Sequence, residues 1–124
     1  GDYVREELKA VNQVLRDHRS GDVHAMDPKL LDLLYLLQQS VAVKGAFHII
    51  SGYRSPATNK QLSAKSSGVA KKSLHMQGKA IDIRLPGCEL KQLQKAALAL
   101  QAGGVGYYPK SDFIHVDTGR VRRW

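Results

Sequence analysis

The apolar residues at the start of the chain recur at helical spacing. Between residues 2 and 19 they lie three or four positions apart, the period of one face of an amphipathic helix. The residues on this face are Val4, Leu8, Val11, Leu15 and His18. Ser20-Gly21 follows, so we expect an N-terminal helix that ends near Arg19.

A denser apolar stretch follows from Leu30 to Leu37. Asp27-Pro28 stands directly before it, and this pair combines an N-cap side chain with a proline suited to the first helical turn. The pattern predicts a second helix that reaches about Val41 and is more buried than the first.

The middle of the chain alternates between short structured segments and a polar stretch. Residues 46–50 are apolar, β-branched at their end and followed by Ser51-Gly52, which predicts a central strand. Residues 56–64 favour another helix. Residues 60–72 carry several serines and four lysines, a composition typical of a solvated loop.

Residues 80–85 show strict alternation, which indicates a strand with two different faces. Ile81, Ile83 and Leu85 form its apolar face, and Ala80, Asp82 and Arg84 form the other.

The last third of the chain predicts a helix and then a hairpin. Residues 89–101 have helical apolar spacing and are followed by Gly103-Gly104. Residues 105–108 and 113–117 are short strand candidates, joined by a turn-forming Pro-Lys-Ser-Asp segment. Helices followed by hairpin-linked strands predict an α+β domain with a largely antiparallel sheet. We expect one domain, with N-terminal helices over about 2–43 and the chemistry over about 46–124.

Composition narrows the function classes. The 124 residues carry 19 Lys+Arg against 11 Asp+Glu, a formal charge of +8 that favours anionic partners. No apolar run approaches the roughly 20 residues of a membrane-spanning helix. Cys88 is the single cysteine, so a cysteine-based metal cluster and an intrachain disulfide are excluded.

Histidine and aspartate residues offer another kind of metal site. His75 lies seven positions before Asp82, which is on the polar face of the predicted strand, and His115 lies within the last strand. Two imidazoles and one carboxylate are a common ligand set for catalytic zinc, which lowers the pKa of a bound water to roughly 7. Spacing alone leaves ordinary polar residues as the commoner explanation.

A longer pattern around these residues resembles a known family. Ser73-x-His75-x-x-Gly78-x-Ala80-x-Asp82 resembles the signature of the zinc D-Ala-D-Ala metallopeptidases, relatives of lysostaphin with the hedgehog fold. Residues 51–55 are similar to the arginine motif that precedes it in these peptidases. Residues 103–124 are similar to the murein endopeptidase branch, and the three motifs occur in the family's order.

The resemblance implies a peptidoglycan peptidase whose Zn²⁺ is held by His75, Asp82 and His115. It also implies that Arg54 clamps a substrate carboxylate or stabilises an oxyanion. Ser73 could bind substrate, although a serine that caps local backbone is nearly as common. The resemblance implies an exported, periplasmic enzyme acting on peptidoglycan cross-link peptides.

The general base is the point where the sequence departs from the family. Many of these peptidases carry Glu three positions before the last histidine, and here that residue is Asp112. Asp117 competes for the role, because residues two apart on a strand share a face. We narrowly favour Asp117 as base, with orientation of a ligand imidazole as its equally weighted alternative.

Two other function classes remain open from the sequence. A catalytically silent zinc domain that binds cell wall would keep the ligands and lack a working base. A basic nucleic-acid-binding module, which we do not expect, would use the lysine-rich segment and the C-terminal arginines. A thiol peptidase built on Cys88 would need a histidine that the zinc motif already uses. The scissile bond and the oligomeric state are not determined by the sequence.

Overall fold

The computed structural model describes residues 15–43, 45–65 and 73–124. The elements run in the order α2 (Pro28–Ser40), β1 (His48–Ser51), α3 (Pro56–Lys65), the 3₁₀ helix η1 (Leu74–Gln77), β2 (Ala80–Arg84), α4 (Leu90–Leu100), β3 (Gly104–Tyr108), β4 (Phe113–Asp117) and β5 (Arg122–Arg123). This is the α+β class expected from the sequence.

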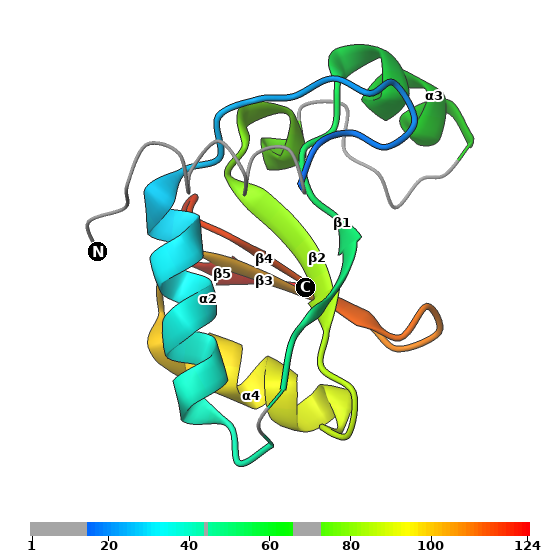
Figure 1. The fold of residues 1–124 in the computed structure, drawn as a ribbon. Coiled ribbons are helices and arrows are strands. Elements are labelled where there is room, and N and C mark those ends of the chain that lie inside the picture. Colours follow the sequence, from blue (N-terminus) through cyan, green and yellow to red (C-terminus); the bar gives the residue numbers. More distant parts are fainter. Residues whose placement is uncertain (1–14, 44, 66–72) are drawn as a thin grey trace.

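The strands of the described part form one sheet with the order β1-β2-β4-β3-β5 (Figure 1). The first three pairings are antiparallel, and β5 runs parallel to β3. The β2–β4 register sets Asp82 opposite His115. The largely antiparallel sheet and the β3–β4 hairpin are therefore confirmed.

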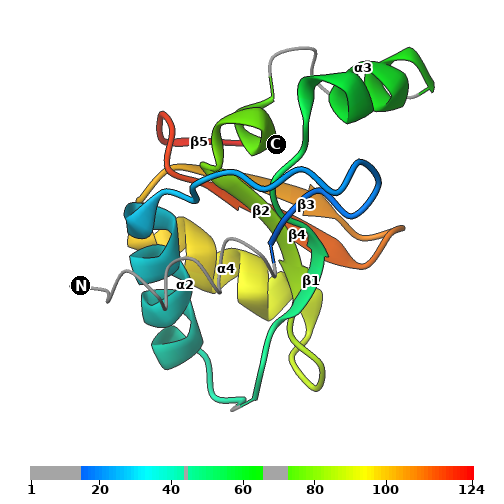
Figure 2. The same ribbon diagram turned by 45° about the horizontal axis from the view of Figure 1, so that its top comes forward.

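Helices α2 and α4 pack together and cover one face of the sheet (Figures 1 and 2). Asp27 caps α2 by accepting a hydrogen bond from the Lys29 amide, as its place before Pro28 predicts. The core between helices and sheet is built from Leu30, Leu33, Leu37, Ile81, Ile83, Leu93, Ala97, Val105, Ile114 and Val116.

Strand alternation sends a second set of side chains to the other face of the sheet. Asp82 of β2 and His115 and Asp117 of β4 point away from the helices and are buried there. They are contacted there by His75 of the 3₁₀ helix, by Arg54 and by Arg122 and Trp124 near the C-terminus. The polar face predicted for residues 80–85 is thus confirmed, with Ala80 and Asp82 buried and Arg84 partly exposed.

One strand prediction is wrong in its position, and one strand was not predicted. Residues 46–50 were expected to form a central strand, but β1 is at the edge of the sheet and Ile49 and Ile50 are 39% and 40% exposed. The apolar run is explained by local strand propensity rather than by burial. Strand β5 had no sequence signal, because two arginines in a row match no strand pattern.

The N-terminal helix prediction falls mostly outside the described residues, which begin at Leu15. Residues 15–20 form turns and bends instead of the predicted end of a helix. His18 and His24 are exposed. The helix expected over 56–64 is confirmed as α3. It includes residues 60–65, which were predicted to lie in a solvated loop, and residues 66–72 of that loop lie outside the described part. No described helix is long and apolar enough to cross a membrane.

Candidate metal centre

Three side chains from separate elements meet on the polar face of the sheet. Oδ1 of Asp82 lies 3.1 Å from Nε2 of His75 and 3.1 Å from Nδ1 of His115. One donor atom from each residue falls within 4.8 Å of the other two, and all three residues are buried. The ligand set predicted from the sequence is therefore brought together in space.

Local structure explains how His75 reaches this point. The Ser73 hydroxyl caps η1 by accepting a hydrogen bond from the His75 amide at 3.1 Å. Gly78 ends the 3₁₀ helix in the left-handed region, with φ of 68°, and turns the chain directly into β2. The seven-residue spacing between His75 and Asp82 is thus one tight helical turn followed by a strand.

The chemistry of the donors suits a metal ion. Nδ1 of His75 lies 2.8 Å from the Gly52 carbonyl oxygen, which can only accept, so Nδ1 carries the proton and Nε2 presents a lone pair toward Asp82 and His115. Such a hydrogen bond on the far ring nitrogen is typical of metal-binding histidines. Neutral nitrogen and carboxylate oxygen donors with this enclosure fit zinc.

Asp82 is held in its charged form. Burial raises the pKa of its carboxyl, but the adjacent imidazoles of His115 and His75 lower it more, to about 2. A carboxylate that stays ionised at neutral pH is the form that ligates a metal.

Asp117 is the most heavily bonded carboxylate of the site. Its Oδ2 lies 2.6 Å from Nε2 of His115 and accepts a hydrogen bond from Arg122 at 3.0 Å. Its Oδ1 accepts from the amides of Gly104 and Gly119. Burial raises the pKa of Asp117, and these partners lower it to well below the ordinary range. The carboxylate is 0% exposed, so both oxygens are enclosed and occupied.

Asp112 lies in a different environment. It occupies the β3–β4 turn with a positive φ of 55°, and its side chain is 68% exposed. Its Oδ2 is 3.8 Å from Nη1 of Arg84, which shares a strand face with Asp82 two residues away. Asp112 is therefore open to solvent and lies next to a residue on the ligand-bearing face of β2.

Arg54 lies beside the ligands rather than on the surface. Its guanidinium is 3.8 Å from Oδ2 of Asp82, donates to Asn59 at 3.1 Å, and has a side chain that is 11% exposed. Its amide donates to the His75 carbonyl at 3.0 Å, which joins the arginine loop to η1. Burial lowers the pKa of Arg54 and Asp82 opposes that effect; an arginine remains charged in either case.

A cavity of about 280 Å³ opens next to Asp82 and Arg54. Its other walls come from the turn over residues 16–19, the β1 end and arginine loop over 50–54, and Thr58, Leu62 and Phe113. The candidate centre therefore has buried ligands on one side and space for a substrate group on the other.

The chain is similar to a known protein family over its whole length. The family model of the peptidoglycan L,D-endopeptidase MepK matches residues 1–124. The chain is 48% identical over 122 residues to the peptidoglycan L,D-endopeptidase MepK of Escherichia coli K12, which covers 98% of this chain and 67% of that protein. It is also 48% identical over 118 residues to the probable peptidoglycan L,D-endopeptidase MepK of Haemophilus influenzae, covering 94% and 63%.

The chain belongs to the MepK family of peptidoglycan endopeptidases. The predicted family and enzyme class, a murein endopeptidase of the metallopeptidase type, are confirmed.

Other features of this family member were not predicted from the sequence. Arg122 binds both oxygens of Asp117, at 3.1 and 3.0 Å. From the sequence, the C-terminal arginines indicated only a basic cluster. Trp124 donates from Nε1 to the Tyr108 hydroxyl at 2.6 Å, and its ring lies 5.0 Å from that of His115. The Gly52 carbonyl that binds His75 is a backbone group, so no residue type in the sequence indicates it.

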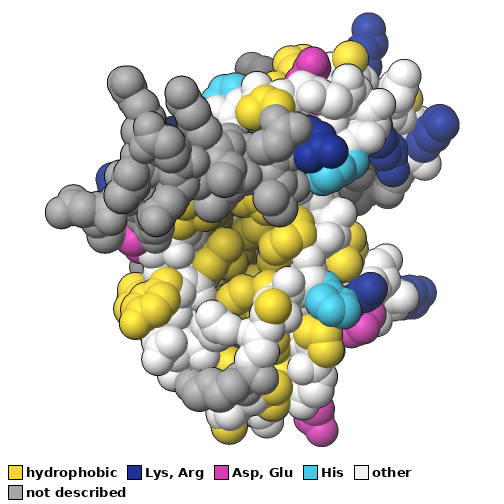
Figure 3. Space-filling view, viewed as in Figure 1, with side chains coloured by type: hydrophobic (Ala, Val, Ile, Leu, Met, Phe, Trp, Pro, Cys, Tyr) yellow, Lys and Arg dark blue, Asp and Glu magenta, His cyan; other side chains and the backbone are white. Residues whose placement is uncertain are grey.

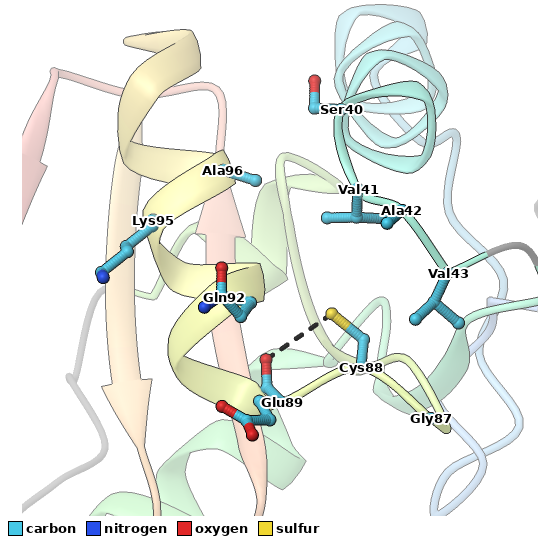
Figure 4. Close-up of a pocket in the computed structure, with 10 residues that line it drawn as sticks. All are labelled: Ser40, Val41, Ala42, Val43, Gly87, Cys88, Glu89, Gln92, Lys95 and Ala96. Atoms are coloured by element: carbon cyan, nitrogen blue, oxygen red, sulfur yellow. Dashed lines mark hydrogen bonds between the residues drawn. The ribbon is translucent and has the colours of Figure 1, made fainter.

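A second cavity, of about 560 Å³, lies between the end of α2 and the start of α4 (Figure 4). Cys88 and Glu89 lie in its wall, and the thiol is 3.6 Å from the Glu89 carbonyl oxygen. This cavity shares no lining residue with the one beside Asp82, and no histidine lines it. A thiol peptidase centred on Cys88 therefore has no imidazole partner among the residues lining that cavity.

Proposed function

We propose that this MepK-family endopeptidase holds one zinc ion on His75, Asp82 and His115 and uses it to hydrolyse an L,D peptide bond in peptidoglycan cross-links. The observation that carries the proposal is the convergence of the three buried donors beside an open cavity. The printed name of the relatives, peptidoglycan L,D-endopeptidase, supports the substrate and bond type.

The ligand atoms we assign are Nε2 of His75, Oδ1 of Asp82 and Nδ1 of His115. When bound, zinc supplies a water of lowered pKa and polarises the amide carbonyl. Because the far nitrogens of both rings have acceptors, Gly52 O and Asp117 Oδ2, each ring is fixed in orientation before any metal binds.

The two candidate carboxylates receive different roles. We assign Asp117 to orient His115, because its oxygens are enclosed and engaged by His115, Arg122 and two backbone amides. A residue with no exposed surface is poorly placed to receive a proton from an attacking water. This leaves Asp112, which is exposed and lies next to Arg84 on the ligand-bearing face of β2, as the proposed proton acceptor.

Arg54 is assigned to the substrate. Its guanidinium lines the cavity while Asn59 and Asp82 hold it in place. A fixed arginine at the cavity wall can bind a carboxylate or the oxyanion that forms when the amide is attacked. Ser73 is a weaker substrate candidate, because its hydroxyl already caps η1.

The bond type selects among the cross-links. A 4-3 link joins the carboxyl of D-alanine to diaminopimelate, whereas a 3-3 link joins the L-centre carboxyl of one diaminopimelate to the D-centre amine of another. An L,D activity therefore favours the 3-3 link as substrate. We expect an enzyme that acts on this substrate to work in the periplasm.

The proposal is tested by metal content and by product analysis together. Metal-replete protein should contain about one zinc per chain, and His75→Ala and His115→Ala should each reduce occupancy. Defined 3-3 and 4-3 muropeptide dimers should then be incubated with the protein and the fragments identified by mass spectrometry. We expect monomers from the 3-3 dimer. Unchanged zinc occupancy in both variants would overturn the ligand assignment, and binding without cleavage would favour a silent cell-wall-binding domain.

A further inference from the structure

The turn over residues 15–22 is fastened to the arginine loop by a buried acid. Asp17 is 4% exposed, and its Oδ2 accepts a hydrogen bond from the Ser55 amide at 2.8 Å. Its Oδ1 accepts from the amides of Arg19 and Ser20 within the turn. One carboxylate therefore fixes the shape of the turn and ties it to the residue that follows Arg54.

Backbone contacts strengthen this junction. The Tyr53 amide donates to the Leu15 carbonyl at 2.7 Å. A Cβ atom added to Gly52 would lie 2.6 Å from the same carbonyl oxygen, so only glycine allows the turn to come this close. The turn is thus packed directly on the loop that carries Arg54 and the carbonyl partner of His75.

The position of the turn makes it one wall of the cavity beside the candidate centre. Arg16, Asp17, His18 and Arg19 all line this cavity, together with Arg54 and Asp82. Lys and Arg side chains gather at the end of the molecule that carries α3 and this turn (Figure 3).

The charges in this wall favour an anion. Asp17 is engaged with backbone amides, and Asp82 belongs to the ligand set. Arg19 is exposed, and among the described residues no carboxylate pairs with its guanidinium. Its charge is near enough to Arg54 to lower the pKa of that guanidinium, after the larger effects of burial and of Asp82. Two arginines that line one cavity repel each other unless an anion lies between them.

We propose that Arg19 is a specificity-determining residue, which binds a free carboxylate of the stem peptide together with Arg54. The proposal rests on the proposed function, which supplies the substrate class. In a cross-link, the diaminopimelate on the amine side keeps a free carboxylate on the carbon that bears the scissile amide nitrogen. A carboxylate next to the reacting bond is the group that a pair of guanidinium groups beside Asp82 can bind.

The test compares substrates that differ only in this carboxylate. A cross-linked dimer with the free carboxylate and one with the carboxylate amidated are hydrolysed by the wild-type protein and by Arg19→Ala, Arg19→Lys and Lys95→Ala. Lys95 is exposed on α4 and lines the other cavity, so Lys95→Ala removes one positive charge away from the candidate centre. Rates should be measured at fixed ionic strength, because exposed charges are screened by salt.

We expect amidation to lower kcat/KM of the wild-type protein by roughly 10–100-fold, mainly through KM, as expected for loss of charge-assisted hydrogen bonds. The kcat/KM of Arg19→Ala should fall about 10-fold for the substrate with the free carboxylate and less than about twofold for the amidated substrate. Arg19→Lys should recover part of the loss, and Lys95→Ala should behave as wild type. Equal losses on both substrates in Arg19→Ala would overturn the proposal.

A binding measurement separates this proposal from the proposed function. The stem tripeptide released on the amine side is titrated calorimetrically into wild-type protein and Arg19→Ala. Two forms are compared, in which the carboxylate on the D-centre of its diaminopimelate is free or amidated. Weaker binding of the free form alone in Arg19→Ala supports the subsite whether or not the protein cleaves either dimer. Identical binding of both forms to both proteins rejects the subsite, even if cross-links are cleaved.

Discussion

The Asp117 carboxylate lies 2.6 Å from Nε2 of His115, on the side of the ring opposite to the nitrogen that meets Asp82. The imidazole is thus held between two buried acids. Burial lowers the pKa of His115, but the neighbouring carboxylates of Asp117 and Asp82 raise it more. Because Asp117 fixes the Nε2 side, Nδ1 is left as the nitrogen that faces the ligand set.

The first prediction follows from this orienting contact. Asp117→Asn should weaken zinc binding by roughly 10–100-fold, as is typical when the partner of a metal-bound histidine is changed. Competition of the purified variant with a zinc chelator of known affinity measures the effect. Zinc affinity equal to that of the wild type, combined with lost activity, would instead return Asp117 to the role of general base.

The second prediction concerns Asp112, whose carboxylate is exposed and lies 3.8 Å from Arg84. Asp112→Asn should retain zinc and lose roughly 10²–10⁴-fold in kcat, the usual contribution of a general base. Arg84→Ala is the matched control for loss of the ion pair, and an exposed pair of this kind contributes little to stability. A fully active Asp112→Asn enzyme would show that this carboxylate does not take the proton.

The sequence predicts much of this centre because its geometry is local. Alternation in residues 80–85 places Asp82 on the polar face of a strand, and the hairpin brings His115 into the same sheet. The spacing from His75 to Asp82 is one short helical turn and a glycine. The motif resemblance then selects these residues from the other histidines of the chain.

The parts that were missed depend on contacts distant in sequence or on backbone atoms. Asp17 binds Ser55 across 38 positions, and the acceptor for His75 is the backbone carbonyl of Gly52. Neither leaves a periodic pattern. Residues 46–50 were assigned to the centre of the sheet because an apolar run has the same composition at an edge, where Ile49 and Ile50 are exposed.

The third prediction concerns Arg54, whose guanidinium contacts Asp82 and lines the cavity. Arg54→Ala should lower turnover by roughly 100-fold or more, the usual cost of removing a donor to a developing charge, while zinc occupancy is unchanged. Arg54→Lys keeps the charge and loses the planar fork, so it should restore only part of the rate. A drop in zinc content parallel to the drop in rate would argue that Arg54 supports the ligands instead.

The fourth prediction uses two glycines with similar backbone conformations, Gly78 with φ of 68° and Gly87 with φ of 84°. Either alanine variant should lose roughly 1–2 kcal/mol from left-handed strain. At Gly78 the added Cβ would also collide with the Ala25 carbonyl oxygen, whereas at Gly87 its contact with Val43 is an ordinary 3.5 Å. Chemical denaturation should therefore show a clearly larger loss for Gly78→Ala, and equal losses would contradict the close approach.

The last prediction is a pH dependence that belongs to Asp17. Burial raises the pKa of this carboxyl. Hydrogen bonds from Ser55, Thr58, Arg19 and Ser20 together lower it by more than burial raises it, so its folded-state pKa lies well below the ordinary 3.8. A lowered folded-state pKa means that the stabilisation is fully present above the unfolded pKa and is lost as pH falls below about 4.

Asp17→Asn keeps the shape of the side chain and removes its charge, which leaves backbone donors facing an amide. We expect it to destabilise the protein by about 1–3 kcal/mol at pH 7, the cost of leaving buried polar groups unsatisfied. Urea denaturation at pH 7, 5 and 3 should give a difference in unfolding free energy between variant and wild type that shrinks only at pH 3. The other carboxylates are present in both proteins, so their acid sensitivity cancels in this difference. A difference that is constant from pH 7 to 3 would mean that the Asp17 charge contributes nothing to holding the turn.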